Sequence, residues 1–176
     1  MASEGQALSL EAATTFLPHF VEVHLTKAFP APPREATRAR LRAMACSELA
    51  DKERELAVAH QLVSSTFIHD DWQNRMRADM DLLLVRWQLE RYNECLEQVE
   101  SLIRLFGGYS GLYNLGASDL FFMKGCILES NGCDLGAAKW FAKSIEIRRK
   151  NLASDHRVLI AAQEAFKRVS GATKTP

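Results

Sequence analysis

Glycine and proline are absent from a long central part of this chain. Its 176 residues include nine glycines and five prolines, yet residues 34–106 contain neither residue type. A domain built only of β-strands needs a turn about every 8–12 residues, and glycine and proline supply many of those turns. Helices joined by polar turns do not need them. The sequence therefore predicts an all-α fold.

An excess of charge of one sign is also absent. The chain has 22 lysines and arginines against 22 aspartates and glutamates, so its formal net charge is zero. This balance argues against a general nucleic-acid-binding protein, which would be basic. Uncharged apolar runs are far shorter than the roughly 18 residues of a membrane span. The first residues resemble neither a secretory signal nor a mitochondrial presequence, so we expect a cytoplasmic protein without a membrane span.

The four cysteines lack the spacing of a metal site. Zinc sites usually contain pairs of ligands about two to four residues apart. Cys46, Cys95, Cys126 and Cys133 form no such pair. They also show no disulfide framework. We therefore expect four reduced thiols and no metal or other cofactor.

Apolar residues recur at helical spacing along most of the chain. A first helix is expected over residues 9–28, and it must end before Phe29–Pro33, whose prolines form the only clear linker. We expect residues 1–33 to hold this helix and linker, residues 34–176 to hold the remaining helices, and the chain overall to form one compact domain. Within residues 34–67 the pattern fits either one long helix or two helices with a charged turn between them.

Further helices are expected at residues 76–89, 94–106, 118–129, 135–149 and 155–170. A polar turn separates the two helices of each successive pair. Gly107-Gly108 has the composition of a helix C-cap, and Ser118 or Asp119 that of the next N-cap. The sequence therefore predicts a series of antiparallel helical hairpins.

The second of these hairpins has a regular pattern of large and small residues. Its first helix carries Phe121, Gly125 and Leu128, and its second carries Ala137, Phe141 and Ser144. Small residues let two helices cross closely, and large ones fill the space between hairpins. The pattern resembles the tetratricopeptide repeat, a helix–turn–helix unit of about 34 residues. The resemblance covers residues 76–170 and implies hairpins stacked as a short superhelix with extra N-terminal helices, residues 155–170 being the capping helix.

The first hairpin departs from the repeat pattern. Leu83 replaces the small glycine, and Cys95 and Val99 replace the alanine and the aromatic residue. Cys95 and Ala137 are 42 residues apart, so the second helix of this hairpin, or its loop, is longer than usual. A third copy with Ala45 and Ala57 at the small positions is possible upstream. An irregular helical bundle is the alternative interpretation.

The resemblance also implies where a partner would bind. The first helix of each hairpin lines the concave face of such a repeat. Counting from Leu83 and Gly125 along these helices, the expected lining residues are Arg77, Met80, Leu84, Trp87, Asp119, Phe122, Cys126 and Glu129. Family members that clamp a carboxylate tail use lysine and asparagine at these places, so no such clamp is expected. The groove is apolar and suits an amphipathic helix, either residues 9–28 or a partner protein.

One enzyme class is the alternative. His69-Asp70, with His19 or His24 upstream and Asp119 or Asp134 downstream, faintly resembles the metal ligands of the HD phosphohydrolases. The same dipeptide is equally typical of a helix cap.

Arg148-Arg149-Lys150 is a small basic cluster that complements the dipole at a helix C-terminus. The leading hypothesis is a non-enzymatic adaptor or assembly subunit that binds a protein partner.

Overall fold

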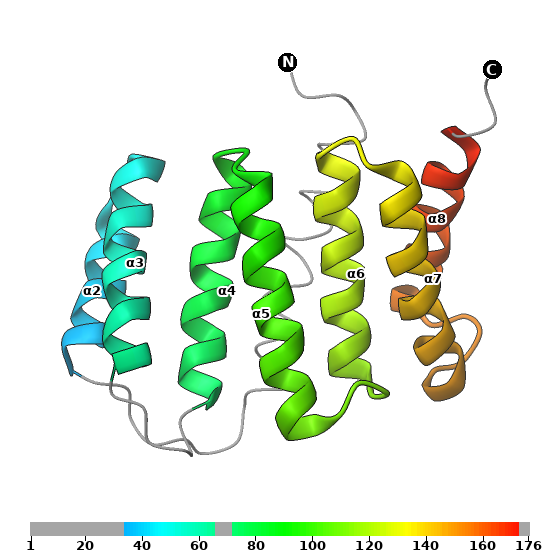
Figure 1. Cartoon of the computed structure of the whole chain (residues 1–176), viewed down its shortest axis with the longest axis horizontal. Helices are drawn as coiled ribbons and strands as arrows, with labels where there is room; N and C mark the ends of the chain where they lie inside the picture. The colour runs from blue at the N-terminus through cyan, green and yellow to red at the C-terminus, as the bar shows by residue number, and fades with distance from the viewer. Residues whose placement is uncertain (1–33, 66–71, 173–176) are drawn as a thin grey trace. The chain divides into compact units, whose positions relative to one another are not determined.

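A computed structural model of the chain describes residues 34–65 and 72–172. Within those residues it contains helices and connecting turns (Figure 1). The described helices are α2 (Arg34–Ala45), α3 (Leu49–Ser65), α4 (Trp72–Gln88), α5 (Tyr92–Ser110), α6 (Leu115–Ser130), α7 (Asp134–Asn151) and α8 (Arg157–Ala172). The prediction of an all-α fold is thereby confirmed. The helix expected at residues 9–28 and the linker after it lie outside the described residues.

The described residues form two compact units. The N-terminal unit consists of residues 34–98, which include α2, α3, α4 and the start of α5. The C-terminal unit consists of residues 99–172, which include the rest of α5 with α6, α7 and α8. The single compact domain expected of the chain overall stays a prediction.

The N-terminal unit begins with two short helices. The chain leaves its helical path between α2 and α3, where the Cys46 N–H donates to the Ala43 carbonyl oxygen at 3.2 Å. Residues 34–65 therefore hold two helices, and most of the charged run lies in the first turns of α3 instead of forming the turn. Buried alanines at positions 36, 39 and 43 give α2 a narrow packing face. Ala45, expected at a buried small position, is exposed.

The hairpin of α4 and α5 turns at Glu90, whose φ of 58° is positive. The polar turn predicted at residues 90–93 is present at its first two residues, and α5 already begins at Tyr92. Across the hairpin, the Cys95 Sγ lies 3.7 Å from the Leu83 carbonyl oxygen, and both side chains are buried. These two residues occupy the positions at which the repeat pattern requires closely crossing helices.

In the C-terminal unit, α5 continues through Gly107-Gly108 instead of ending there. A Cβ on Gly107 would lie 2.7 Å from the Leu112 Cδ2, so this glycine serves side-chain packing. The turn is made at Gly111, with a φ of 77°. The next helix is capped by the Asn114 side chain, which accepts the Ala117 N–H at 2.9 Å. The predictions of a C-cap at Gly107-Gly108 and an N-cap at Ser118 or Asp119 are therefore wrong.

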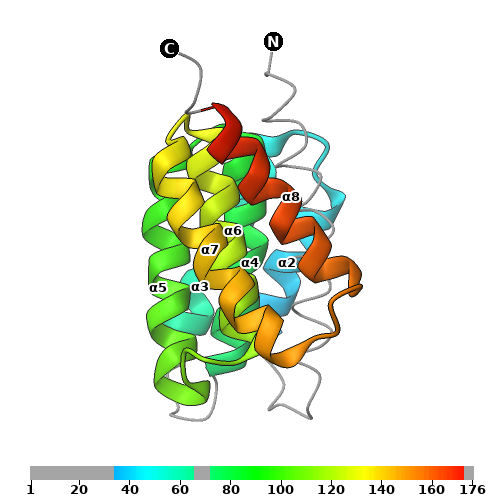
Figure 2. The same cartoon turned by 90° about the vertical axis from the view of Figure 1, so that its right-hand side faces the viewer.

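Helix α6 is buried along almost its whole length and packs against α7. A Cβ on Gly125 would lie only 2.5 Å from the Phe141 Cε1, so the absence of a side chain there lets the aromatic ring approach α6. The Ser144 Oγ donates to the Ser118 carbonyl oxygen at 2.8 Å. Gly132, with a φ of 73°, makes the predicted turn between the two helices. Helix α8 then lies beside α7 (Figure 2).

Candidate functional site

A buried arginine on α7 connects three helices of the C-terminal unit. The Arg148 side chain is fully buried and its Nη2 donates to the Asp119 Oδ1 of α6 at 2.7 Å. Its Nε donates to the Ser118 Oγ at 3.3 Å, and its Nη1 donates to the Val158 carbonyl oxygen at the start of α8 at 2.9 Å. Burial lowers the pKa of Arg148, and the Asp119 carboxylate opposes that shift. These contacts hold the first turn of α8 against α6 and α7.

A second arginine fixes the other end of α8. The Arg168 Nε and Nη2 donate to the two carboxylate oxygens of Glu129, at 2.6 and 2.9 Å. The hydrogen bond to Glu129 raises the pKa of Arg168. Such two-point pairs restrict orientation as well as distance. Because α8 is held near both ends, its position beside α7 does not depend on packing alone.

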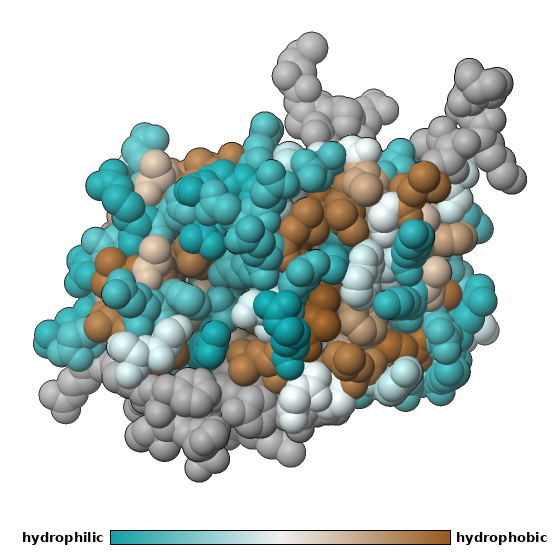
Figure 3. All heavy atoms as spheres, viewed as in Figure 1, coloured by the Kyte–Doolittle hydropathy of each residue, from teal (hydrophilic) through white to brown (hydrophobic). Residues whose placement is uncertain are grey.

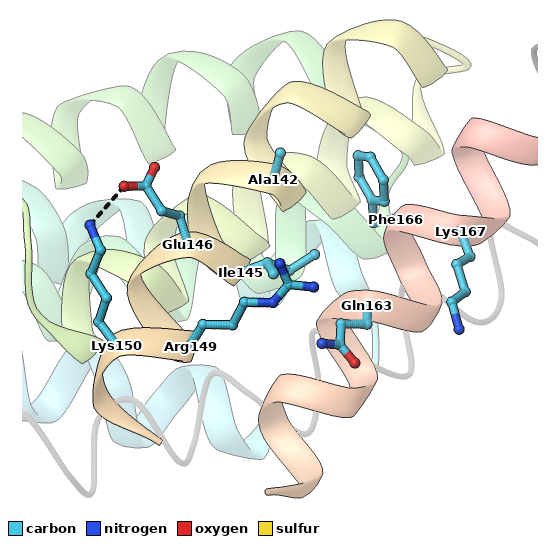
Figure 4. A pocket seen from close by; sticks show the side chains of 8 residues that line it. All are labelled: Ala142, Ile145, Glu146, Arg149, Lys150, Gln163, Phe166 and Lys167. Atoms are coloured by element: carbon cyan, nitrogen blue, oxygen red, sulfur yellow. Dashed lines mark hydrogen bonds and ion pairs between the residues drawn. The ribbon is translucent and has the colours of Figure 1, made fainter. Parts of the chain in front are cut away.

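The two fixed helices border an open groove of about 740 Å³, which we call the α7–α8 groove. Ala142, Ile145, Glu146, Arg149 and Lys150 line it from α7, and Gln163, Phe166 and Lys167 line it from α8. Figure 4 shows the Phe166 ring turned toward Ala142, and Arg149 and Gln163 reaching toward each other with Ile145 behind them. The volume lies within the roughly 300–1,000 Å³ of typical ligand clefts.

The charges at the groove are unequally paired. The Lys150 Nζ donates to the Glu146 Oε1 at 2.8 Å, and this hydrogen bond lowers the pKa of Glu146 and raises that of Lys150. No carboxylate of the described residues lies within ion-pair distance of Arg149 or Lys167. Three cations and one carboxylate line the groove, so its formal charge is +2. An apolar floor with unpaired cations can bind an amphipathic, negatively charged group.

The basic cluster at residues 148–150 is not merely a complement to the helix dipole. Arg148 is buried at the junction of three helices, Arg149 lies in the groove, and Lys150 is paired with Glu146 on the surface. Successive residues of a helix point about 100° apart, which directs the three side chains to different surroundings. The sequence alone did not reveal that these three side chains have different surroundings, and it therefore did not predict the groove. The only available signal was the helical spacing of Ala142, Ile145 and Arg149.

The residues expected to line a concave groove belong to different units. Arg77, Met80, Leu84 and Trp87 lie on α4, and Asp119, Phe122, Cys126 and Glu129 lie on α6. Met80, Trp87, Phe122 and Cys126 are each at most 2% exposed, Asp119 is also buried, and Arg77 and Leu84 are partly buried. These positions are therefore mostly buried, and what covers the expected groove, residues 9–28 or a partner, stays a prediction. Residues 9–28 lie outside the described part of the chain.

For α6 the physical reason for this burial is visible. The Phe122 ring packs against the Phe141 ring of α7, with centroids 5.4 Å apart, and the Arg148 guanidinium lies 4.9 Å from its centroid. Burial raises the pKa of the Cys126 thiol, and the Glu129 side chain is held by Arg168. Contacts with α7 and α8 thus account for the burial of these α6 side chains.

The N-terminal unit contains two polar clusters. The Asp79 carboxylate is buried, lies 2.9 Å from the His60 Nε2 and accepts from the Gln98 Nε2 at 3.3 Å. Beside it, Glu53 accepts from the Arg86 Nε at 3.1 Å and from the Arg91 Nη1 at 2.6 Å. Each cluster joins the α3 helix to a later helix of the same unit.

The metal ligands considered for an HD phosphohydrolase are mostly undescribed. His19, His24, His69 and Asp70 lie outside the described ranges. Asp119 lies inside them, and its carboxylate is bound to Arg148. Within residues 34–65 and 72–172, no group of three or more potential ligands is close enough to hold a metal ion.

None of the described helices is long and apolar enough to cross a membrane. No protein-family model matches the sequence, and no curated protein matches it either.

Proposed function

We propose that this chain is a non-enzymatic protein–protein interaction adaptor or assembly subunit, and that it binds a segment of a partner in the α7–α8 groove. The observation that carries the proposal is the construction of this groove. Arg148 and Arg168 hold α8 at both ends, while Arg149 and Lys167, above an apolar floor, have no acidic partner within residues 34–65 and 72–172. A site whose walls are already fixed loses little conformational entropy on binding.

The order of the helices supports a repeat-type scaffold. The hairpins α4–α5 and α6–α7 are followed by α8, in the order expected of two tetratricopeptide-like repeats and a capping helix. The close approach of Phe141 to Gly125 agrees with the register that the resemblance implies. In this proposal the capping helix completes the fold and also forms one wall of the binding site.

The proposal is tested by blocking the groove without disturbing the core. Ala142 is exposed and lines the groove, so Ala142→Arg places a long side chain in it at little cost to folding. Ala50→Arg, at an exposed position of α3, is the matched control. The parent, both variants and a bead-only sample are used for quantitative affinity capture from the native cell.

We expect the parent and the Ala50→Arg variant to capture the same protein in comparable amounts and the Ala142→Arg variant to lose it. Thermal melts of the three chains should agree. If the Ala142→Arg variant folds normally and captures everything that the parent captures, the groove is not the binding site and the proposal is wrong.

A further inference from the structure

We infer that the α7–α8 groove receives an acidic amphipathic helix of a partner protein. The inference rests on the proposed function and adds the conformation and charge of the bound segment. It follows from three properties of the groove: its walls, its length and its charge.

The walls of the groove favour a helix over an extended segment. An extended peptide needs partners for its own backbone N–H and C=O groups, as at the edge of a β-sheet. Both walls are helices, whose interior backbone groups are already hydrogen-bonded to each other. Gln163 is the uncharged polar side chain among the groove residues, and one amide cannot serve a whole extended strand. A helical segment satisfies its own backbone and needs only side-chain contacts.

The length and floor of the groove match one face of a short helix. The α7 wall extends from Ala142 to Lys150, nine residues over which the helix rises about 12 Å. This length corresponds to about two turns of a bound helix, which presents apolar residues at positions i, i+3 or i+4, and i+7. Ile145 and Phe166 provide the apolar contacts for such residues (Figure 4).

The charge of the groove selects acidic flanks on that helix. Arg149 stands on the α7 side and Lys167 on the α8 side, and neither has an acidic partner among the described residues. Lys150 is already paired with Glu146. A helix with carboxylates on both sides of its apolar stripe would meet one unpaired cation on each wall. A basic helix would meet a groove with a formal charge of +2.

The experiment uses the full chain and three synthetic 18-residue amphipathic helices labelled with a fluorophore. The peptides share one leucine stripe and differ only in the flanking residues, which are all Glu, all Gln or all Lys. Fluorescence anisotropy at about 0.15 M salt, where charges separated by more than about 8 Å are screened, measures the Kd of each. We expect the Glu peptide to bind about tenfold more tightly than the Gln peptide, and the Lys peptide more weakly than both.

A charge reversal locates the binding. The Arg149→Glu/Lys167→Glu double variant should reverse the order, so that the Lys peptide binds most tightly. Lys139→Glu/Arg157→Glu introduces the same charge change at exposed positions on the same two helices outside the groove. This control should keep the parent order. All chains should show the same far-UV circular dichroism.

Three results would overturn the inference. The first is a Glu peptide that binds no better than the Lys peptide. The second is a preference that survives the Arg149→Glu/Lys167→Glu change. The third is a parent chain that dimerises through the groove in sedimentation, since the occupant would then be a second copy. If the peptides fail while Ala142→Arg still abolishes partner capture, the inference alone is wrong; if that substitution has no effect on capture, the proposed function is wrong.

Discussion

The two units bury their polar groups in different ways. In the C-terminal unit one guanidinium is completely removed from water and reaches two helices through Asp119, Ser118 and Val158. In the N-terminal unit the corresponding ion pairs are partly hydrated. The Arg86 and Arg91 side chains, which share Glu53, are 24% and 44% exposed.

This difference has an energetic consequence. Removing one partner of a buried ion pair leaves an uncompensated charge in a poorly polarisable environment and is costly. Exposed pairs contribute little individually and weaken in salt. Figure 3 shows hydrophobic residues gathered over α6 and mostly hydrophilic residues over α4. The C-terminal unit thus contains a fully buried guanidinium, whereas the arginines paired with Glu53 in the N-terminal unit stay partly hydrated, although the Asp79 carboxylate of that unit is also buried.

Each unit contains one buried cysteine, whose alkylation reports how often that unit opens to solvent. Cys95 and Cys126 are buried, one in each unit, whereas Cys133 is exposed and Cys46 is partly exposed. Burial raises the pKa of Cys95 to about 12, so its reactive thiolate is scarce at pH 8. We expect native-state alkylation of Cys95 and Cys126 to be on the order of a thousandfold slower than that of Cys133. Mass spectrometry of partially labelled chains measures each rate.

If the units open independently, increasing urea should accelerate the labelling of Cys95 and Cys126 at different concentrations. Identical urea dependence of the two rates would mean that the units unfold together. All four thiols should react in the denatured, unreduced chain, as expected of a protein without disulfides.

Replacing Arg148 should have the largest effect on stability. Arg148→Met leaves the buried Asp119 carboxylate without its ion-pair partner, and we expect a loss of about 3–5 kcal/mol in the free energy of unfolding. Urea denaturation followed by circular dichroism measures it, and the labelling rate of Cys126 should rise with it. Arg148→Met/Asp119→Leu removes both charges and should recover most of the loss. A single variant as stable as the parent would contradict the role of this ion pair.

The approach of Phe141 to α6 predicts a smaller loss. Gly125→Ala places a methyl group about where the Phe141 ring now lies, and overpacking of this kind costs about 1–3 kcal/mol. Gly108→Ala is the matched control, since its added Cβ meets nothing within 4 Å and α5 is helical there. We expect the control to gain about 0.5–1 kcal/mol. Thermal melts in which both variants behave alike would remove the evidence for a close crossing at Gly125.

The smallest effect is expected in the N-terminal unit. Glu53→Gln weakens the hydrogen bonds from Arg86 and Arg91, and we expect a loss of about 1–2 kcal/mol at low salt. The loss should shrink in about 1 M NaCl, where the screening length is roughly 3 Å. Asp51→Asn disrupts the more exposed pair with Arg54 and should leave the unfolding free energy unchanged. A Glu53→Gln loss that is independent of salt would mean that this unit, too, depends on desolvated charge.

Much of this fold could be predicted from the sequence because its signals are local. Helical periodicity located the segments from α4 to α8, and polar residues marked the turns at Glu90 and Gly132. The boundary at Gly107-Gly108 was misplaced because a glycine pair that ends a helix and one that admits a side chain look alike in sequence. Only the contact with Leu112 distinguishes the two cases.

The candidate site could not be predicted, because its geometry is set by contacts between distant residues. Arg148 and Asp119 are 29 residues apart, as their hydrogen bond joins α7 to α6, and Arg168 and Glu129 are 39 apart. No periodic pattern indicates such pairs. Phe166 and Ile145 also look like ordinary core residues in the sequence, and only the position of α8 makes them the floor of a groove.

The different surroundings of Arg148 and Arg149 limit the insertions and deletions that the gene can tolerate within α7. One points into the protein and the other into the groove, and a helix turns by about 100° with each residue. Inserting one codon upstream of them within α7 would move Ile147 to the core position of Arg148 and leave the buried Asp119 carboxylate without its ion-pair partner. Length variation among descendants of this gene should therefore avoid α7 and accumulate in the turns at residues 111–114 and 152–156.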